Sequence, residues 1–328
     1  MSYAVAVDAG GTTTRGVVVA SDGTCLGYGV SGRGNPVSAG AEVAAASVGE
    51  AVEAALTRAG VPGEGVDAVV LTMAGGSTGP LDPLIERLRA LGIGPPPVLK
   101  GDLLSSLCSG TPSLDGYAVI AGTGAGAARI VGGTMVAVAD ALGWLIGDGG
   151  SGFWIGHQVV RAAFAGLDGF GPRTALTGSL LRCLGVPFDE HRVAERPVAR
   201  AEAVRRVYAL RPVELSQFAH LAFEAGDDEV ARGIVAAAAS ELARTLVAVA
   251  DPAVRGPVVL AGGVFAHHPS FAASVRALAH DVPATAFTTV SDGAVGVAVL
   301  ALRELGVTVE APTHHRVAST LRDLMRRP

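Results

Sequence analysis

Residues 3–20 read YAVAVDAGGTTTRGVVVA, and this stretch decides the fold. An alternating apolar run ends at Asp8, a Gly/Thr turn follows, and a second β-branched run begins after Arg15. Alternation on both sides of a short glycine-containing turn is typical of a β-hairpin. A further turn, Asp22-Gly23, leads to a third expected strand over residues 24–30. The chain therefore opens with a three-stranded β-meander.

The same order of elements returns later in the chain. Residues 117–131 read YAVIAGTGAGAARIV, and a Gly132-Gly133 turn leads to another expected strand over 134–139. The tyrosine that begins each stretch precedes an arginine by 12 residues (3 to 15 and 117 to 129). We therefore expect two similar lobes, each of which starts with a strand, a glycine-rich turn and a second strand.

After each three-strand unit the period of the apolar residues becomes helical. The expected helices are 42–59, 81–91, 152–165, 176–184, 199–208, 214–225, 229–250 and 293–305, and the further expected strands are 66–73, 97–100 and 258–260. Antiparallel strands followed by alternating strands and helices predict an α/β fold with two lobes and a cleft between them.

Composition and charge exclude several classes of protein. Glycine contributes 45 of 328 residues, about twice the usual share, but no G-X-Y period indicates collagen. No uncharged apolar stretch is long enough to span a membrane, and the first residues lack the basic region of a signal peptide. The net charge of −5 gives nucleic-acid binding little support. Cys25, Cys108 and Cys183 lie far apart, which indicates free thiols in a reducing cytoplasm.

Two glycine-rich turns are candidate phosphate sites. Small residues let the backbone approach a ligand, N–H groups can line an anion-binding concavity, and threonine hydroxyls add donors. Two such turns that face each other across a cleft would clamp a polyphosphate. An ordinary glycine-containing hairpin is the alternative for either turn. The candidate residues are Gly10, Gly11, Thr12 and Thr13 in the first turn and Gly122, Thr123 and Gly124 in the second.

Common nucleotide-binding motifs do not explain these turns. The chain has no GxxxxGK[ST] sequence, and its single lysine, Lys100, lies elsewhere. Each turn leads into a strand and not into a helix, which excludes a Rossmann fingerprint. Asp8 at the end of the first strand could hold Mg²⁺, because Mg²⁺ binds through one or two carboxylates plus phosphates. Its alternative role is to cap the turn.

Asp102 is the candidate base. It follows the expected strand at 97–100 and opens a helix-like segment, which places its carboxylate at the cleft. A hydroxyl that accepts a phosphoryl group needs a base to take its proton. Aspartate is equally favoured as a helix N-cap, and its position alone does not separate the two roles.

Four further segments carry small or polar residues where strands end. Residues 143–156 read GWLIGDGGSGFWIG, and Asp148 is the hydroxyl acceptor in this loop. Asn35 lies in the turn GRGNP, and Gly75-Gly76 follows the strand at 66–73. Gly262-Gly263 follows the strand at 258–260 and could pack against adenine or ribose. A plain glycine turn is the alternative in each case.

Taken as a set, these motifs resemble the N-acetylglucosamine kinase branch of the BadF/BadG/BcrA/BcrD ATPase family, which belongs to the actin/hexokinase/Hsp70-type ATPases. The set consists of DxGGTxT after the first strand, GTG after the repeated strand, the GDxGSGxWIG loop and a late GGV. The motifs occur in the family's order over roughly residues 3–303. GDxGSGxWIG is the most specific of them.

The resemblance implies an α/β fold of two ribonuclease-H-like, actin-like ATPase lobes with the active site in the cleft between them. The lobes would comprise residues 1–115 and 116–292, with a C-terminal helix, about residues 293–328, that returns to the first lobe. The resemblance also implies an ATP- and Mg²⁺-dependent kinase that phosphorylates the 6-hydroxyl of N-acetylglucosamine or glucosamine. It favours a homodimer.

By the same resemblance each candidate residue receives a role. Asp8 would serve Mg²⁺, and Asp102 would deprotonate the 6-hydroxyl of the bound sugar. The two glycine-rich turns would bind the phosphates, and Gly262-Gly263 would bind the adenosine. The residues that would bind sugar hydroxyls are Asn35, Gly75, Gly76 and Asp148.

Departures from the family pattern leave the sugar unidentified. Gly149 stands where kinases of this branch usually have Glu, and Leu142 stands where they often have Trp. Two other functions stay open: a non-catalytic sugar or nucleotide sensor, and an ATPase that activates a partner dehydratase through an iron–sulfur cluster. The presence of Asp8 and Asp102 argues against the sensor. Val119 stands where an activator would place a cysteine, which argues against the activator.

Overall fold

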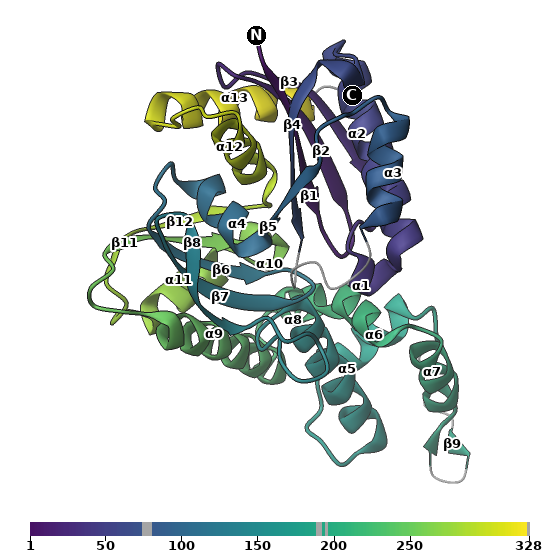
Figure 1. Cartoon of the computed structure of the whole chain (residues 1–328). Helices are drawn as coiled ribbons and strands as arrows, with labels where there is room; N and C mark the ends of the chain where they lie inside the picture. The colour runs from purple at the N-terminus through teal and green to yellow at the C-terminus, as the bar shows by residue number, and fades with distance from the viewer. Residues whose placement is uncertain (74–80, 188–191, 194–195, 327–328) are drawn as a thin grey trace.

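Two five-stranded mixed sheets organise the computed structural model, which describes residues 1–73, 81–187, 192–193 and 196–326 (Figure 1). The first sheet consists of β1 (Tyr3–Ala9), β2 (Thr14–Ala20), β3 (Cys25–Ser31), β4 (Val66–Met73) and β5 (Pro97–Gly101). β1, β2 and β3 are antiparallel neighbours, and β4 and β5 continue the sheet beyond β1 as parallel strands. The strand order is β3-β2-β1-β4-β5.

The second sheet repeats this topology. It consists of β6 (Gly116–Ala121), β7 (Ala125–Val131), β8 (Thr134–Asp140), β11 (Gly256–Ala261) and β12 (Ala284–Val290). From the antiparallel edge its order is β8-β7-β6-β11-β12, with β11 and β12 parallel to β6. The predicted fold class, two α/β lobes of similar construction, is therefore confirmed.

Helices cover the outer face of each sheet, so the central strands are buried on both faces. On the first sheet lie α2 (Ala41–Ala59) and α3 (Asp82–Ala90), with the short α1 (Pro36–Ala39) and the 3₁₀ helix η1 (Gly63–Gly65) beside them. The elements of the second lobe are α5 (Gly152–Asp168), α6 (Ala175–Cys183), β9 (Arg192–Val193), β10 (Arg196–Pro197), α7 (Val198–Tyr208), the 3₁₀ helix η2 (Pro212–Phe218), α8 (His220–Glu224), α9 (Glu229–Val249), α10 (Gly263–His267) and α11 (Pro269–Leu278).

Two helices, α4 (Asp102–Gly110) and α12 (Ala294–Glu304), lie between the sheets (Figure 1). α4 packs mainly against the second sheet, α12 packs against the first, and the two helices contact each other. Small residues make this crossing close, since a Cβ at Gly296 would clash with the carbonyl oxygen of Ser105. The N–H of Gly296 also donates to Oγ of Ser109 at 2.9 Å. A single apolar cluster therefore joins both sheets through α4 and α12.

Some elements differ from the sequence-based expectations. The helix expected at 214–225 is the 3₁₀ helix η2 followed by the short α8. β12 was not expected. The helix expected at 293–305 is α12, and the segment from about 293 to 328, which the family resemblance implied to be one C-terminal helix, also contains a separate α13 (Ala311–Arg326). β12 is an edge strand without a fully buried residue, so it lacks the apolar run of a central strand. α13 packs against β3, and only Val317 and Leu321 of this helix are buried. Two buried positions are too few to show a helical period in the sequence.

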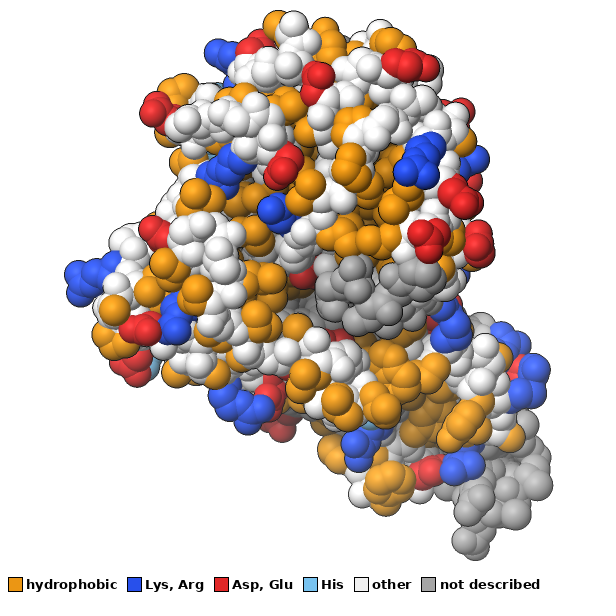
Figure 2. Space-filling model, in the orientation of Figure 1, with side chains coloured by type: hydrophobic (Ala, Val, Ile, Leu, Met, Phe, Trp, Pro, Cys, Tyr) orange, Lys and Arg blue, Asp and Glu red, His pale blue; other side chains and the backbone are white. Residues whose placement is uncertain are grey.

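Cysteines and surface charges agree with the expectations from composition. All three cysteines are free, and Cys25 and Cys108 are buried. Basic and acidic side chains are interspersed on the face shown in Figure 2. Within the described part of the chain, no helix has the length and apolar character that a membrane crossing requires.

Candidate active site

The turn between β1 and β2 is closed by its own backbone. The N–H of Gly10 donates to the carbonyl oxygen of Thr13 at 3.0 Å, and a Cβ at Gly10 would stand 2.8 Å from that oxygen. The turn therefore requires glycine at this position. Gly11 and Thr13 are partly exposed and Thr12 is exposed, so N–H and hydroxyl groups of the turn are accessible to a ligand.

The turn between β6 and β7 has the matching construction. The N–H of Gly122 donates to the carbonyl oxygen of Gly124 at 2.9 Å, and Thr123 between them is partly exposed. Two further bonds fasten this turn to the start of α5. The N–H of Gly152 donates to Gly122 O at 2.7 Å, and the N–H of Phe153 donates to Thr123 O at 3.2 Å. The second turn and the N-terminus of α5 thus form one connected unit.

The loop that precedes α5 holds unusual backbone conformations. Asp140, Ala141 and Asp148 are the non-glycine residues with positive φ in the described part of the chain, at 61°, 58° and 61°. Such conformations persist where neighbouring contacts enforce them, and they cluster at functional sites. Here the Asp140 carboxylate accepts from the N–H groups of Asp148 and Gly149 at 2.7 and 2.9 Å. Asp140 therefore holds this loop in its strained form.

Asp148 directs its carboxylate at the second glycine-rich turn. Oδ1 accepts from the N–H of Ala125 at 3.2 Å, and a Cβ at Gly124 would stand 2.9 Å from Oδ2. Burial raises the pKa of Asp148, and the negative charge of Asp140 adds to the increase, while the Ala125 N–H acts against it. In this structure Asp148 fixes the turn, and its contact with a sugar hydroxyl stays a prediction.

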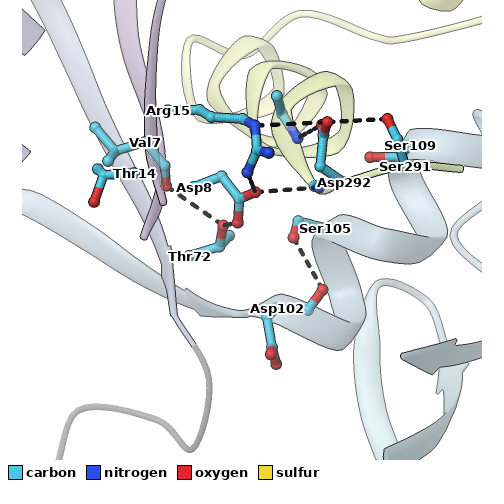
Figure 3. Close-up of polar contacts among 12 residues, drawn as sticks. Val7, Asp8, Thr14, Arg15, Thr72, Asp102, Ser105, Ser109, Ser291 and Asp292 are labelled. Carbon is cyan, nitrogen blue, oxygen red and sulfur yellow. Dashed lines mark hydrogen bonds and ion pairs between the residues drawn. The ribbon is translucent and has the colours of Figure 1, made fainter. Parts of the chain in front are cut away.

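Asp8 lies at the end of β1 in a group of polar side chains from several elements (Figure 3). Its carboxylate is 3.9 Å from Nη1 of Arg15 on β2. It accepts from the N–H of Gly293, just before α12, at 3.2 Å and from Oγ1 of Thr72 on β4 at 3.4 Å. Arg15 also pairs with Asp292, where Nε and Oδ2 are 3.6 Å apart. Arg15 therefore bridges two carboxylates from opposite ends of the chain.

The environment of Asp8 fits a divalent cation. Burial raises its pKa from 3.8 to about 6, and the charges of Asp292 and Asp102 add to the increase, although Arg15 acts against it. A bound cation would add positive charge beside this carboxylate, in addition to that of Arg15. The described residues contain no group of three or more side chains suited to hold a metal. A cation at Asp8 would therefore be held by one or two carboxylates and by phosphates, as Mg²⁺ usually is.

Replacing Asp8 by asparagine is expected to stabilise the ligand-free protein. The pKa of Asp8 is about 6 in the folded protein and 3.8 in the unfolded chain. The folded protein therefore loses stability as the pH rises from 3.8 through about 6 and the buried carboxyl group ionises. Ionised Asp8 thus costs up to about 3 kcal/mol at pH 8, and about half of that at pH 5. Thermal unfolding of the wild type and of Asp8→Asn at pH 5 and pH 8 measures the increase in stability. An Asp8→Asn variant that unfolds at a lower temperature than the wild type at pH 8 would contradict the assignment.

Asp102 begins α4, and its carboxylate points away from the group of Asp8, Arg15 and Asp292 (Figure 3). Gly101 occupies the N-cap position, and no side chain caps the helix, so the alternative role of Asp102 as an N-cap is wrong. Burial raises the pKa of Asp102, and the charge of Asp148 adds to the increase. The charge of Asp102 in turn raises the pKa of Asp8, so each of the three predicted carboxylates lies close enough to another to influence a pKa.

Gly262-Gly263 lies beside the second glycine-rich turn. A Cβ at Gly262 would stand 2.5 Å from the carbonyl oxygen of Ala121 and 3.1 Å from the N–H nitrogen of Gly122. The φ of Gly262 is 106°, which also favours glycine. Gly263 begins α10. The predicted adenosine segment and the predicted phosphate turn are therefore neighbours.

The Asn35 loop lies beside the first glycine-rich turn. The N–H of Gly34 donates to the carbonyl oxygen of Gly10 at 3.1 Å. Asn35 itself is buried and directly precedes α1. The structure therefore brings this candidate sugar residue to the first phosphate turn. The candidates Gly75 and Gly76 lie outside the described residues.

The two departures from the family pattern have different surroundings. A Cβ at Gly149 would stand 3.2 Å from Oε2 and 3.3 Å from Cβ of Glu241 on α9. A side chain at this position would therefore point at α9, where Glu241 already provides a carboxylate. Leu142 is exposed, as are Leu145 and Ile146 in the same loop.

Sequence reasoning missed Arg15 and Asp292 as members of the site. The hairpin register offered a signal for Arg15, because it pairs directly with Asp8 across β1 and β2. No local pattern marks Asp292, which reaches the site only through the tertiary position of α12.

Comparison with known proteins places the chain among ATPases. The family model described as BadF/BadG/BcrA/BcrD ATPase family matches residues 5–301. The chain is similar to the N-acetyl-D-glucosamine kinase of Dictyostelium discoideum, with 26% identity over 223 residues that cover 65% of this chain and 70% of that protein. It is also similar to the N-acetylmuramic acid/N-acetylglucosamine kinase of Clostridium acetobutylicum, with 28% identity over 191 residues, 58% of this chain and 62% of that protein.

Among solved structures, the chain resembles a protein from Chromobacterium violaceum that is proposed to be an N-acetylglucosamine kinase. The TM-score is 0.72 at 22% identity, and the match covers 92% of this chain and 99% of the other. At this identity the likeness shows the fold. It agrees with the two lobes that the sheets define.

Proposed function

Because the chain belongs to the BadF/BadG/BcrA/BcrD ATPase family, we propose that it is an ATP-dependent amino-sugar kinase. It transfers the γ-phosphoryl group of ATP to the 6-hydroxyl of N-acetylglucosamine or glucosamine. The observation that carries this proposal is the position of two carboxylates at two matching glycine-rich turns: Asp8 lies at the end of the strand before the first turn, and Asp148 accepts from the N–H of Ala125 at the second turn, at 3.2 Å. The names of the two curated relatives support the substrate class.

The nucleotide is held by backbone groups of both lobes. N–H and hydroxyl groups of Gly10–Thr13 and Gly122–Gly124 bind the phosphates, and Gly262-Gly263 accommodates the adenosine. Asp8 holds Mg²⁺ together with the phosphates, with Arg15 beside it as a counter-charge. When bound, Mg²⁺ neutralises charge that develops on the transferred phosphoryl group.

Asp102 acts as the base for the sugar hydroxyl. Its burial and the charge of Asp148 raise its pKa, which favours proton acceptance, while the N–H of Leu103 acts against the increase. Asn35 and Asp148 orient the sugar from the two lobes, together with Gly75 and Gly76. Because a side chain at position 149 would point at α9, Gly149 has little influence on which sugar binds.

We place the lobes at residues 1–115 and 116–292, with the segment from about 293 completing the first lobe. The substrates are small molecules, because acidic net charge and interspersed surface charges give no support to nucleic-acid binding. We further propose that the protein is a cytoplasmic homodimer that binds no membrane.

The proposed function is tested by a coupled assay of ADP release with Mg·ATP and a panel of sugars. The panel contains glucosamine, N-acetylglucosamine, N-acetylmannosamine, N-acetylmuramic acid, kanosamine and glucose. ADP release that depends on an amino sugar, with a 6-phosphate as the product by mass spectrometry and NMR, is the expected result. ADP release that no sugar in the panel changes would contradict the proposal.

A further inference from the structure

An exposed apolar segment runs along β8 and the loop that follows it. Five of the ten large apolar side chains that are at least half exposed in the described chain lie within residues 136–146. Single exposed apolar side chains are normal, but a contiguous group marks a surface that another molecule covers. The five residues, which we call the β8 patch, have exposed fractions from 50% to 76% and are Val136, Val138, Leu142, Leu145 and Ile146.

The β8 patch lies at a free edge of the second sheet. β8 pairs with β7 on one side, and no described strand pairs with its other side. Proteins usually protect such an edge with charged side chains or proline, and residues 134–139 contain neither. The register with β7 skips Val136, but such a bulge disturbs pairing only locally. This edge is therefore open to a partner.

The segment that carries the patch offers no charge to a partner. Residues 131–146 contain no basic side chain and a single acidic one, Asp140. The Asp140 carboxylate is turned onto its own loop, where it accepts from the N–H groups of Asp148 and Gly149 at 2.7 and 2.9 Å. A basic or acidic protein, or the headgroups of a charged lipid surface, would find no complementary charge on this segment. The partner of the patch is therefore itself apolar and uncharged at the contact.

The loop part of the patch is held in place by its own lobe. The N–H of Gly147 donates to Gly143 O at 2.8 Å, which closes the loop into a turn. The ring of Trp144 in this turn packs against Phe153 of α5, with the ring centroids 5.6 Å apart. These contacts hold the exposed side chains of the loop at the surface, as expected of a contact surface that is formed before its partner binds.

Size and symmetry identify the partner. The five side chains expose roughly 550 Å², so a contact between two copies would bury about 1,100 Å², which exceeds the roughly 1,000 Å² that a biological interface needs. In a two-fold contact each surface meets its own copy, and an uncharged apolar patch is complementary to itself. We propose that two copies of this chain associate through the β8 patch around a two-fold axis. This inference rests on the homodimer of the proposed function and names its interface.

Lysine substitutions in the patch test the inference. In Leu145→Lys and Val138→Lys, positive charges of the two copies would meet in an apolar contact, and like charges that face each other strongly oppose association. The dissociation constant of the dimer is expected to rise by at least about 100-fold in each variant. Sedimentation velocity of the full chain, from nanomolar to high micromolar concentration, measures this constant. Added sodium chloride should not weaken the wild-type dimer, because the patch holds no ion pair that salt could screen.

Val43→Lys is the matched control for Val138→Lys. Both valines are 51% exposed, but Val43 lies on α2 of the first lobe. This variant should dimerise as the wild type does. Circular dichroism shows whether each variant is folded, and Leu145→Lys keeps the test decisive if Val138→Lys disturbs β8, because Leu145 is an exposed loop residue.

The outcomes separate this inference from the proposed function. A wild-type chain that stays monomeric at high micromolar concentration overturns the inference. So does a dimer that Leu145→Lys and Val138→Lys leave intact, because another surface then forms it. A dimer that sodium chloride dissociates, or that Val43→Lys also disrupts, contradicts an apolar contact at β8. Failure of the proposed function appears separately, as absence of amino-sugar-dependent ADP release by the wild type, whatever its oligomeric state.

Discussion

Replacing Asp102 by asparagine is expected to lower kcat for sugar phosphorylation by about 100- to 10,000-fold, the usual contribution of a general base. Asparagine keeps the size of the side chain but cannot accept the proton of the sugar hydroxyl. Asp102 is not the N-cap residue of α4, and asparagine can still accept the hydrogen bond that Oδ1 of Asp102 accepts from the N–H of Leu103 at 2.9 Å. Binding of Mg·ATP should change little, because Asp102 contacts neither glycine-rich turn in the hydrogen bonds of the described residues.

Steady-state kinetics and titration with Mg·ATP check this prediction together. Asp323→Asn is the matched control, because it makes the same chemical change at an exposed position on α13. Near-normal turnover of Asp102→Asn would remove Asp102 from the role of base. A loss of turnover with an equal loss of Mg·ATP affinity would instead assign the residue to nucleotide binding.

Replacing Gly296 by alanine is expected to destabilise the protein by about 3 kcal/mol or more, the upper end of the cost of overpacking a core. The new methyl group would clash with the carbonyl oxygen of Ser105, which is backbone and cannot rotate away. α4 and α12 would have to separate, and the hydrogen bond from Gly296 N–H to Ser109 would be lost. The melting temperature should fall by about 6 °C or more.

Gly233 on α9 offers the same substitution with the opposite expected effect. It is an exposed helical glycine, and a Cβ there would meet no atom within 4 Å, so Gly233→Ala should stabilise the protein by about 0.5–1 kcal/mol. Calorimetry of both variants compares the same chemical change in two surroundings. If Gly296→Ala melts at the wild-type temperature, the close helix crossing is wrong.

Local patterns were enough to predict the two meanders and their turns. Gly10 and Gly122 lie in tight turns whose geometry depends on a few neighbouring residues, so sequence alone located them. The repeated order of strand, turn and strand also predicted two similar sheets. Asp8, Asp102 and Asp148 became candidates because each follows a recognisable strand or lies in a specific motif, and their roles stay predictions.

What could not be predicted depends on contacts between distant segments. Asp292 joins Arg15 only because α12 crosses from the far end of the chain to the first sheet. Gly149 faces Glu241 on α9, and no spacing in the sequence connects these two positions. Residues 134–139 were expected as a strand, but the exposure of Val136 and Val138 is visible only in three dimensions.

The position of α12 has a consequence for synthesis on the ribosome. β1 emerges long before the helix that covers its inner face, because that helix begins only at Ala294. At roughly 5–20 residues per second, the first sheet waits about 15–60 s for this cover. During that time the apolar residues beneath α12 face solvent or a chaperone. We therefore expect the nascent chain to need protection for the strands of its first sheet until α12 has been synthesised.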